Sequence, residues 1–162
     1  MMKKAIVIAS LLFTYVALSK EYVIDNYTLT WTAAELPTTS LLIEKTEEKL
    51  RVIMRKKSGI SFDSIYLSPD EARDLGGALS RANEFYTKQK DTKIDITEVV
   101  KVGTYAVTFL TSPKNGFSIV IRQSERFAMG GLVLDRKEAL AMSEQLQDIV
   151  EKAHFLNNAI KL

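Results

Sequence analysis

The sequence predicts an α+β fold made by internal duplication, in which a unit of four strands and a helix occurs twice and gives two antiparallel sheets with two packed helices. Three observations support this prediction. Stretches of period-two alternation come in groups, an apolar stripe of helical spacing follows each group, and the second group repeats the signals of the first at an offset of 67 residues.

The repeat is clearest between segment 50–86 and segment 117–153, which align without a gap although only six of the 37 pairs are identical. The stretch LRVIMR in the first copy and FSIVIR in the second both alternate, so each predicts a strand with one buried face. The short stretches IYL and LVL then predict a second strand that runs directly into a helix. The physical pattern therefore recurs where the letters do not.

Both predicted helices begin with the same kind of cap. Ser68 and Asp135 are good N-cap residues, and three residues after each of them a glutamate, Glu71 or Glu138, can accept from the cap amide to complete a capping box. Apolar side chains then recur at spacings of three and four, which predicts one stripe packed on a sheet. The stripe residues are Ala72, Leu75, Leu79, Ala82 and Tyr86 in the first copy and Ala139, Met142, Leu146, Ile149 and Ala153 in the second.

Further strands are predicted upstream of each copy. The stretches TTSLLIEKTEEKLRVIMRKK and TYAVTFLTSPKNGFSIVIRQ each give two strands joined by a polar turn, and EYVIDNYTLTW and KIDITEVVKV each add one more. The polar stretch TKQKDTK joins the halves. We therefore expect residues 20–162 to form a single domain of two pseudo-repeats, at about 22–88 and 93–160.

Residues 1–19 have the features of a secretory signal peptide. They combine two lysines near the start, an uncharged apolar run over residues 5–18 and small residues before a predicted cleavage point preceding Lys20. The run is shorter than the ~20 residues that span a bilayer, so it predicts export to the periplasm or medium, with no stable membrane span after the leader is removed. The sequence contains no cysteine, which excludes disulfides and thiol chemistry.

Signatures of an enzyme are missing from the sequence. His154 is the only histidine, so a zinc site made of histidine and cysteine ligands is excluded, and no phosphate-binding or nucleophile-elbow motif occurs. The carboxylates Asp70, Glu71 and Asp74 lie in the first turn of a predicted helix, where the helix dipole explains them. The sequence therefore predicts a protein that is not an enzyme, without catalytic residues, metal or cofactor. A hydrolase that uses carboxylates alone is the remaining catalytic alternative.

Tandem units of four strands and a helix resemble the Whirly family and the related single-stranded-DNA-binding transcriptional coactivators. The resemblance covers roughly residues 22–160 and lies in the order of elements. It implies two curved sheets that project outward, helices packed between the halves and bases stacked along the strands. The outward strand positions that would contact a nucleic acid are Arg51, Arg55, Tyr66 and Arg122.

Charge and the predicted leader favour a different function. Without Lys3 and Lys4 of the leader, the 22 Lys and Arg become 20, which equals the 20 Asp and Glu, and acidic residues such as Glu44, Glu47 and Glu48 accompany the arginines. The leading hypothesis is therefore an exported, non-catalytic binding or assembly domain, whose partner is an unknown protein or ligand and which self-associates through strand edges or helix faces. The alternative is a single-stranded nucleic-acid-binding protein of Whirly-like fold.

Overall fold

A computed structural model describes residues 27–124 and 131–159, so the predicted leader at residues 1–19 lies outside the described part of the chain. The strands form two antiparallel sheets of four, each in sequence order. Sheet A contains β1 (Thr28–Glu35), β2 (Thr39–Thr46), β3 (Leu50–Ser58) and β4 (Ser61–Leu67). Sheet B contains β5 (Ile96–Val102), β6 (Tyr105–Ser112), β7 (Gly116–Gln123) and β8 (Leu132–Leu134).

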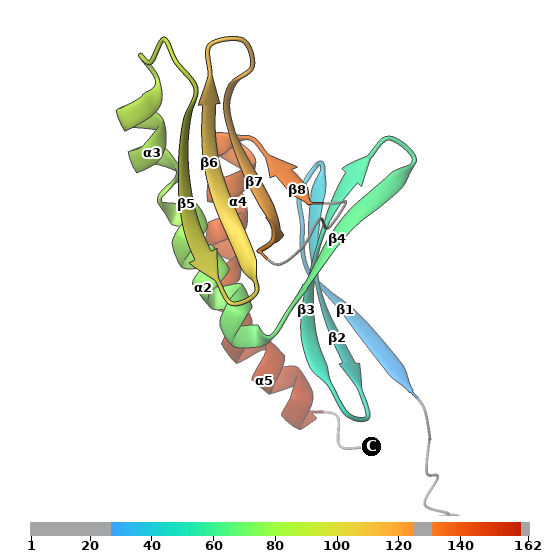
Figure 1. Ribbon diagram of the computed structural model, residues 1–162. Coiled ribbons are helices and arrows are strands. Elements are labelled where there is room, and N and C mark those ends of the chain that lie inside the picture. The colour runs from blue at the N-terminus through green and yellow to red at the C-terminus, as the bar shows by residue number, and fades with distance from the viewer. Residues whose placement is uncertain (1–26, 125–130, 160–162) are drawn as a thin grey trace, which may run out of the picture.

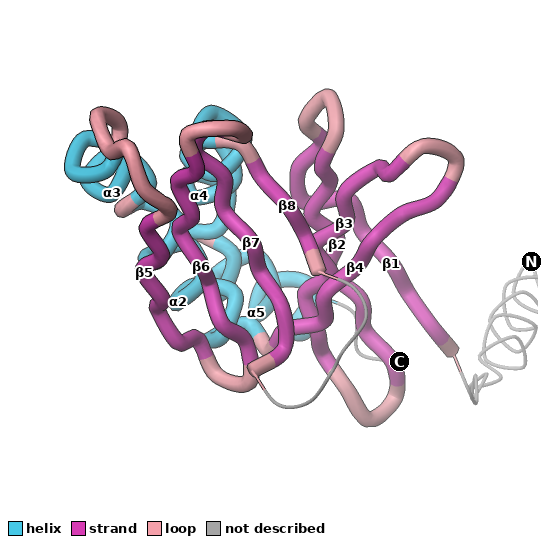
Figure 2. Tube along the Cα trace, turned by 45° about the horizontal axis from the view of Figure 1, so that its top comes forward, coloured by secondary structure: helices cyan, strands magenta, loops and turns pink. Residues whose placement is uncertain are grey.

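Helices follow each sheet in the chain. They are α2 (Pro69–Ser80) and α3 (Ala82–Gln89) after sheet A, and α4 (Arg136–Gln147) and α5 (Ile149–Ala159) after sheet B. The helices gather on one side of the molecule, and the two sheets diverge from them (Figure 1; Figure 2). The predicted α+β class with two antiparallel sheets is confirmed. In the part of the chain that the structure describes, no helix is long and apolar enough to cross a membrane.

The predicted single helix of each half is broken into two segments. The breaks fall at Arg81, with φ −79° and ψ 0°, and at Asp148, with φ −96° and ψ 10°, which are the same position of the 67-residue repeat. A ψ near zero ends the helical hydrogen-bond ladder and lets the chain change direction. The apolar stripe continues across the break at Ala82 and Ile149, which are both fully buried, and Phe85 of α3 also packs inward, stacked on Phe109 of β6 at 4.2 Å between ring centroids.

The strand registers match the repeat with one exception. Val52 pairs with Leu67 in sheet A and Ile119 pairs with Leu134 in sheet B, at equivalent positions. Between the equivalent pairs Lys45–Leu50 and Thr111–Phe117, the β2–β3 connection has four residues, 46–49, and the β6–β7 connection has five, 112–116. The longer turn contains a residue with positive φ, Gly116 at φ 73°. Positions of β2 therefore correspond to β6 at an offset of 66 rather than 67 residues.

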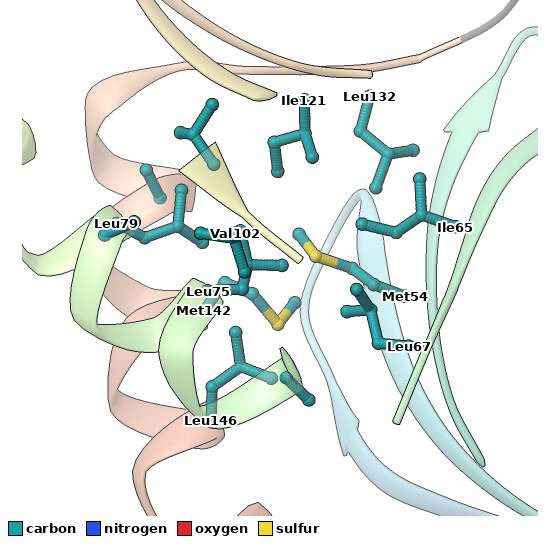
Figure 3. Packing of buried hydrophobic residues seen from close by; sticks show 14 of the residues in the cluster. Met54, Ile65, Leu67, Leu75, Leu79, Val102, Ile121, Leu132, Met142 and Leu146 are labelled. Carbon is teal, nitrogen blue, oxygen red and sulfur yellow. The ribbon is translucent and has the colours of Figure 1, made fainter. Parts of the chain in front are cut away.

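One hydrophobic core serves both halves. The inner faces of the two sheets and the apolar sides of the helices contribute to a single cluster of buried residues. Figure 3 shows Met54, Ile65 and Leu67 of sheet A on one side of this cluster and the helix residues Leu79 and Leu146 on the other. Leu79 and Leu146, which occupy the same repeat position, are both fully buried. Each half therefore completes the core of the other.

The most extensive contact between the halves is the crossing of α2 and α4. A Cβ atom added to Gly76 would lie 2.8 Å from the Leu146 Cβ, and the Ser143 hydroxyl donates to the Gly76 carbonyl at 2.8 Å. Gly76 and Ser143 are separated by 67 residues and so are repeat equivalents that touch each other. This placement puts a pseudo-twofold axis through the crossing point.

The two capping boxes also bind each half to the other. Both form as predicted, at Ser68 with Glu71 and at Asp135 with Glu138. The Glu138 carboxylate accepts from Lys56 Nζ at 2.6 Å and from the Thr38 hydroxyl, both in the first half. The Glu71 carboxylate lies against Gly103 in the β5–β6 turn, where an added Cβ would fall 2.1 Å from Oε1. The start of each helix is thus fixed to a hairpin of the opposite half.

A pair of adjacent glycines tests the helix crossing. Gly76→Ala should lower the free energy of unfolding by about 1–3 kcal/mol, because the new methyl group overlaps Leu146 Cβ. Gly77→Ala is the matched control, since among the described residues its added Cβ meets no atom within 4 Å apart from its own helix backbone and chain neighbours, and it should raise stability by about 0.5–1 kcal/mol through helix propensity. Urea unfolding measures both changes. Equal effects of the two substitutions would contradict the close crossing.

Glu138 should make the stability of the fold depend on pH. Burial alone raises the pKa of the Glu138 carboxyl, but hydrogen bonds from Lys56, Thr38 and the Asp135 amide, with the charge of Lys56, outweigh it, so the pKa lies below the ordinary 4.5. A lowered pKa contributes stability above the unfolded value that is lost as the pH falls through the folded value.

We therefore expect Glu138→Gln to cost about 1–2 kcal/mol near neutral pH and progressively less below about pH 4.5, as measured by urea unfolding across pH. Glu71→Gln is the matched control, because Glu71 makes the equivalent capping box but, among the described residues, no ion pair. It should cost less than Glu138→Gln near neutral pH. A constant difference between wild type and Glu138→Gln at every pH would refute the role given to this carboxylate.

Candidate functional site

The outer face of sheet A, meaning the face turned away from the core, carries most of the residues that the sequence singled out. Side chains of a strand alternate between faces, and Val52 and Met54 of β3 are buried in the core. Arg51, Arg55 and Lys57 of the same strand therefore lie on the outer face. Arg51 and Arg55 are thus on the face that the alternation of the sequence predicts for them.

Strand β4 adds aromatic rings to this face. Phe62 pairs with Lys57 across the strands, and Tyr66 pairs with Ile53, so both aromatic residues share the outer face. The Phe62 side chain is 61% exposed and that of Tyr66 is 48% exposed. Ser64 lies between them, opposite Arg55, and leaves room on the strand between the two rings. The face thus combines cations with accessible aromatic surface.

An apolar floor lies beneath these side chains. Ile53 is only 1% exposed although it is on the outer face, between Arg51 and Arg55 along β3 and opposite Tyr66. Its cross-strand neighbour Leu42 is 8% exposed. Long arginine stems and a tyrosine ring cover apolar surface effectively while their polar ends remain in water. The side chains above this floor are therefore held close to the sheet.

Arg51 is held in place by two contacts. Its guanidinium forms an ion pair with Glu44 at 2.6 Å, and it lies over the Tyr66 ring at 4.7 Å from the centroid. The side chain of Arg51 is 42% exposed, so water screens the ion pair and its net stabilisation is small. The main effect of Glu44 and Arg51 is to orient the Tyr66 ring.

Arg55 and Lys57 are the cations that are available to a ligand. Among the described residues, neither of them forms an ion pair or a side-chain hydrogen bond, whereas the neighbouring Lys56 points to the opposite face and binds Glu138. An anion that reaches these two side chains displaces water rather than a protein carboxylate. Arg55 and Lys57 lie opposite Ser64 and Phe62 of β4, beside the exposed aromatic surface.

The backbone of Tyr66 is fixed by a residue of the other half. Strand β4 is an edge strand of sheet A, and the Tyr105 hydroxyl donates to the Tyr66 carbonyl at 2.9 Å and accepts from the Tyr66 amide at 3.2 Å. Tyr105 is 7% exposed, so its hydroxyl is held by packing. The contact positions the Tyr66 ring and also blocks this part of the edge from pairing with another strand.

Arg122 is not part of this arrangement. It is the repeat equivalent of Arg55 and lies on the outer face of sheet B. Val120, two residues before Arg122, lies on the same face. The residues beside it across the neighbouring strands include Val99 and Val133 and no aromatic residue. Arg51, Arg55 and Tyr66 are therefore brought together by the fold, while Arg122 is on a different sheet.

Phe62 is the residue that the sequence did not single out. It follows the tight turn at Gly59, where φ is 62°, and alternation back from Tyr66 through Ser64 assigns it to the outer face once the start of β4 at Ser61 is known. The sequence stretch GISFDSIYL gives no clear strand start, since polar and apolar residues are mixed near the turn.

Within residues 27–124 and 131–159 no group of three or more His, Asp or Glu side chains is placed to hold a metal ion, and His154 is exposed on α5.

No protein-family model matches the sequence, and no curated protein shows a significant match to it.

The contact between Tyr105 and Tyr66 predicts a defined loss on removal of one hydroxyl. Tyr105→Phe should lower the free energy of unfolding by about 1 kcal/mol and speed hydrogen exchange at the Tyr66 amide. Tyr86→Phe is the control, because the Tyr86 hydroxyl makes no hydrogen bond within the described part of the chain. NMR-detected exchange and urea unfolding measure the two quantities. Indistinguishable behaviour of the two variants would rule the contact out.

Proposed function

We propose that this chain is an exported, non-catalytic binding domain and that the outer face of sheet A binds its ligand. The observation that carries the proposal is a difference between the two halves. The scaffold repeats, yet Arg51, Lys57 and Tyr66 have Ser118, Ser124 and Val133 as their equivalents. Since the second half folds without these cations and this ring, the fold itself does not require them.

The chemistry of the face defines the class of ligand. Arg55 and Lys57 favour negative charge, and the exposed rings of Phe62 and Tyr66 favour flat groups that can stack. The two aromatic residues are four positions apart on one strand, which corresponds to about 13 Å at about 3.3 Å per residue. The ligand that fits is an extended anionic polymer with rings along it. The predicted leader, if it directs export, favours an acidic polysaccharide.

Single-stranded nucleic acid is the second candidate ligand. The same observation of rings beside arginines favours it, because bases stack on aromatic side chains while basic residues contact the phosphates. The Whirly-like order of elements also supports this candidate. A retained leader inside a cell or organelle would favour nucleic acid, whereas a mature N-terminus at Lys20 outside the cytoplasm would favour the exported binding domain.

The binding face can be tested with labelled polymers at low salt. We expect fluorescence anisotropy to detect binding of alginate or of oligothymidylate, with affinity that falls as salt rises. Arg55→Ala combined with Lys57→Ala should weaken binding by about tenfold or more, because each lost contact with an anion costs about 1 kcal/mol. Tyr66→Ala should weaken it by a similar factor through lost stacking.

Arg122→Ala is the matched control, since it removes the repeat equivalent of Arg55 from the other sheet, and it should leave affinity unchanged. Preference for alginate over oligothymidylate would assign the polysaccharide, and the reverse preference would assign nucleic acid. Failure of both polymers to bind at low salt, or equal weakening by Arg122→Ala, would overturn the proposed face.

A further inference from the structure

A cavity of about 440 Å³ opens where the end of α3 and the segment that follows it meet the β6–β7 hairpin. It lies beside sheet B, on which α3 packs, and shares no residue with the outer face of sheet A. The residues that line it are Tyr86, Lys90, Thr92, Lys93, Thr111, Ser112, Pro113, Gly116 and Phe117. Its volume is within the range of small-molecule sites, which is roughly 300–1,000 Å³.

The lining is positively charged. It includes Lys90 and Lys93 and, among the described residues, no acidic side chain. The end of α3 brings the negative end of a helix dipole to the same place, equivalent to roughly half an elementary charge. Two lysine charges outweigh it, so the cavity favours an anion. Neither lysine forms an ion pair with any residue that the structure describes.

A buried polar pair lies behind one wall. The Thr111 hydroxyl, which lines the cavity, donates to Gln89 Oε1 at 2.8 Å, and Gln89 is only 2% exposed. The Gln89 Nε2 has no hydrogen-bond partner within the described part of the chain. An unpartnered buried donor costs stability and calls for an explanation. Rotation of the carboxamide would let Nε2 donate to Thr111 and free the Thr111 hydrogen for a ligand oxygen.

Two aromatic rings form the apolar side of the cavity. Tyr86 and Phe117 meet edge to face, with 5.5 Å between ring centroids and 77° between planes. The guanidinium of Arg136 lies over the Tyr86 ring at 4.1 Å and adds a further cation beside the cavity. A flat ring of a ligand can pack against these aromatic groups while its charged group reaches the lysines.

The equivalent space in the first half is occupied. Thr111 corresponds to Lys45 at the β2-to-β6 offset of 66, and Lys90 corresponds to Asn157 at the offset of 67. The Lys45 Nζ donates to the Asn157 carbonyl at 3.1 Å and so spans from strand to helix end. The second half has a short threonine where the first has this long side chain. The scaffold therefore does not require the cavity to be open.

We propose that this cavity binds a small anionic ligand that carries a flat ring. Lys90 and Lys93 bind the anionic group, the Thr111 hydroxyl donates to one of its oxygens, and Tyr86 with Phe117 contacts the ring. This site is independent of the polymer-binding face on sheet A.

The test is an NMR titration of the full chain with phenyl phosphate, inorganic phosphate and benzyl alcohol. Phenyl phosphate should bind saturably, with shifts centred on the cavity residues, about tenfold more tightly than inorganic phosphate, and benzyl alcohol should not saturate. Lys90→Ala with Lys93→Ala should weaken phenyl phosphate binding at least about tenfold. Thr111→Lys should abolish it by filling the cavity as Lys45 does in the first half.

Lys49→Ala with Lys101→Ala is the control that removes the same charge away from the cavity, and it should change the affinity by less than about twofold. A thermal melt of each variant establishes that it is folded, and if Thr111→Lys does not fold, the double alanine variant decides. Equal binding by the Lys90 and Lys93 double variant, saturable binding of benzyl alcohol, absence of phenyl phosphate binding, or shifts centred on Arg55 and Tyr66 would each overturn the site.

Discussion

The close approach of α2 and α4 is the constraint on which the rest of the structure depends. At Gly76 the absence of a side chain lets the helix contact Leu146 Cβ, and Ser143, the equivalent residue of the other helix, donates to the Gly76 carbonyl. Helix axes that pass this closely bring the inner faces of both sheets onto one core. Without the crossing, each sheet would expose an apolar face that one helix alone cannot cover.

The comparison of two halves of one chain separates what the scaffold needs from what it does not. The capping boxes, the breaks at Arg81 and Asp148 and the buried leucines at positions 79 and 146 recur at the same offset. Arg51, Lys57 and Tyr66 on the outer face of sheet A do not recur, and neither does Lys45 at the place of Thr111. The residues of the two proposed sites thus lie mainly at positions where the halves have diverged.

Local signals made much of the fold predictable from the sequence. Alternation in β3 assigned Val52 to the core and Arg55 to the surface, and the capping boxes fixed where the helices begin, because both depend on neighbouring residues. The helix breaks left no such signal. Spacings of three and four continue through Arg81, since the second segment buries the same side of the chain after the turn.

The two proposed binding sites were less predictable because they depend on tertiary placement. The repeat already assigned Arg122 to the second unit, but only the strand pairing shows that Arg51, Arg55 and Tyr66 meet on one face of the first sheet. The cavity was hidden because Lys90 and Lys93 lie in a polar connecting stretch, and only the fold brings them to Thr111 and Phe117. A difference of one residue between two turns also had to be known before Lys45 could be matched with Thr111.

Native-state hydrogen exchange in increasing denaturant tests the shared core most directly. If both halves depend on one helix crossing, the slowest amides of β2 and β3, of β6 and β7, and of α2 and α4 should all exchange with the same free energy of opening, equal to that of global unfolding. Two groups of amides, one for each half, that open at clearly different free energies would show that each half is stable by itself and would contradict this account.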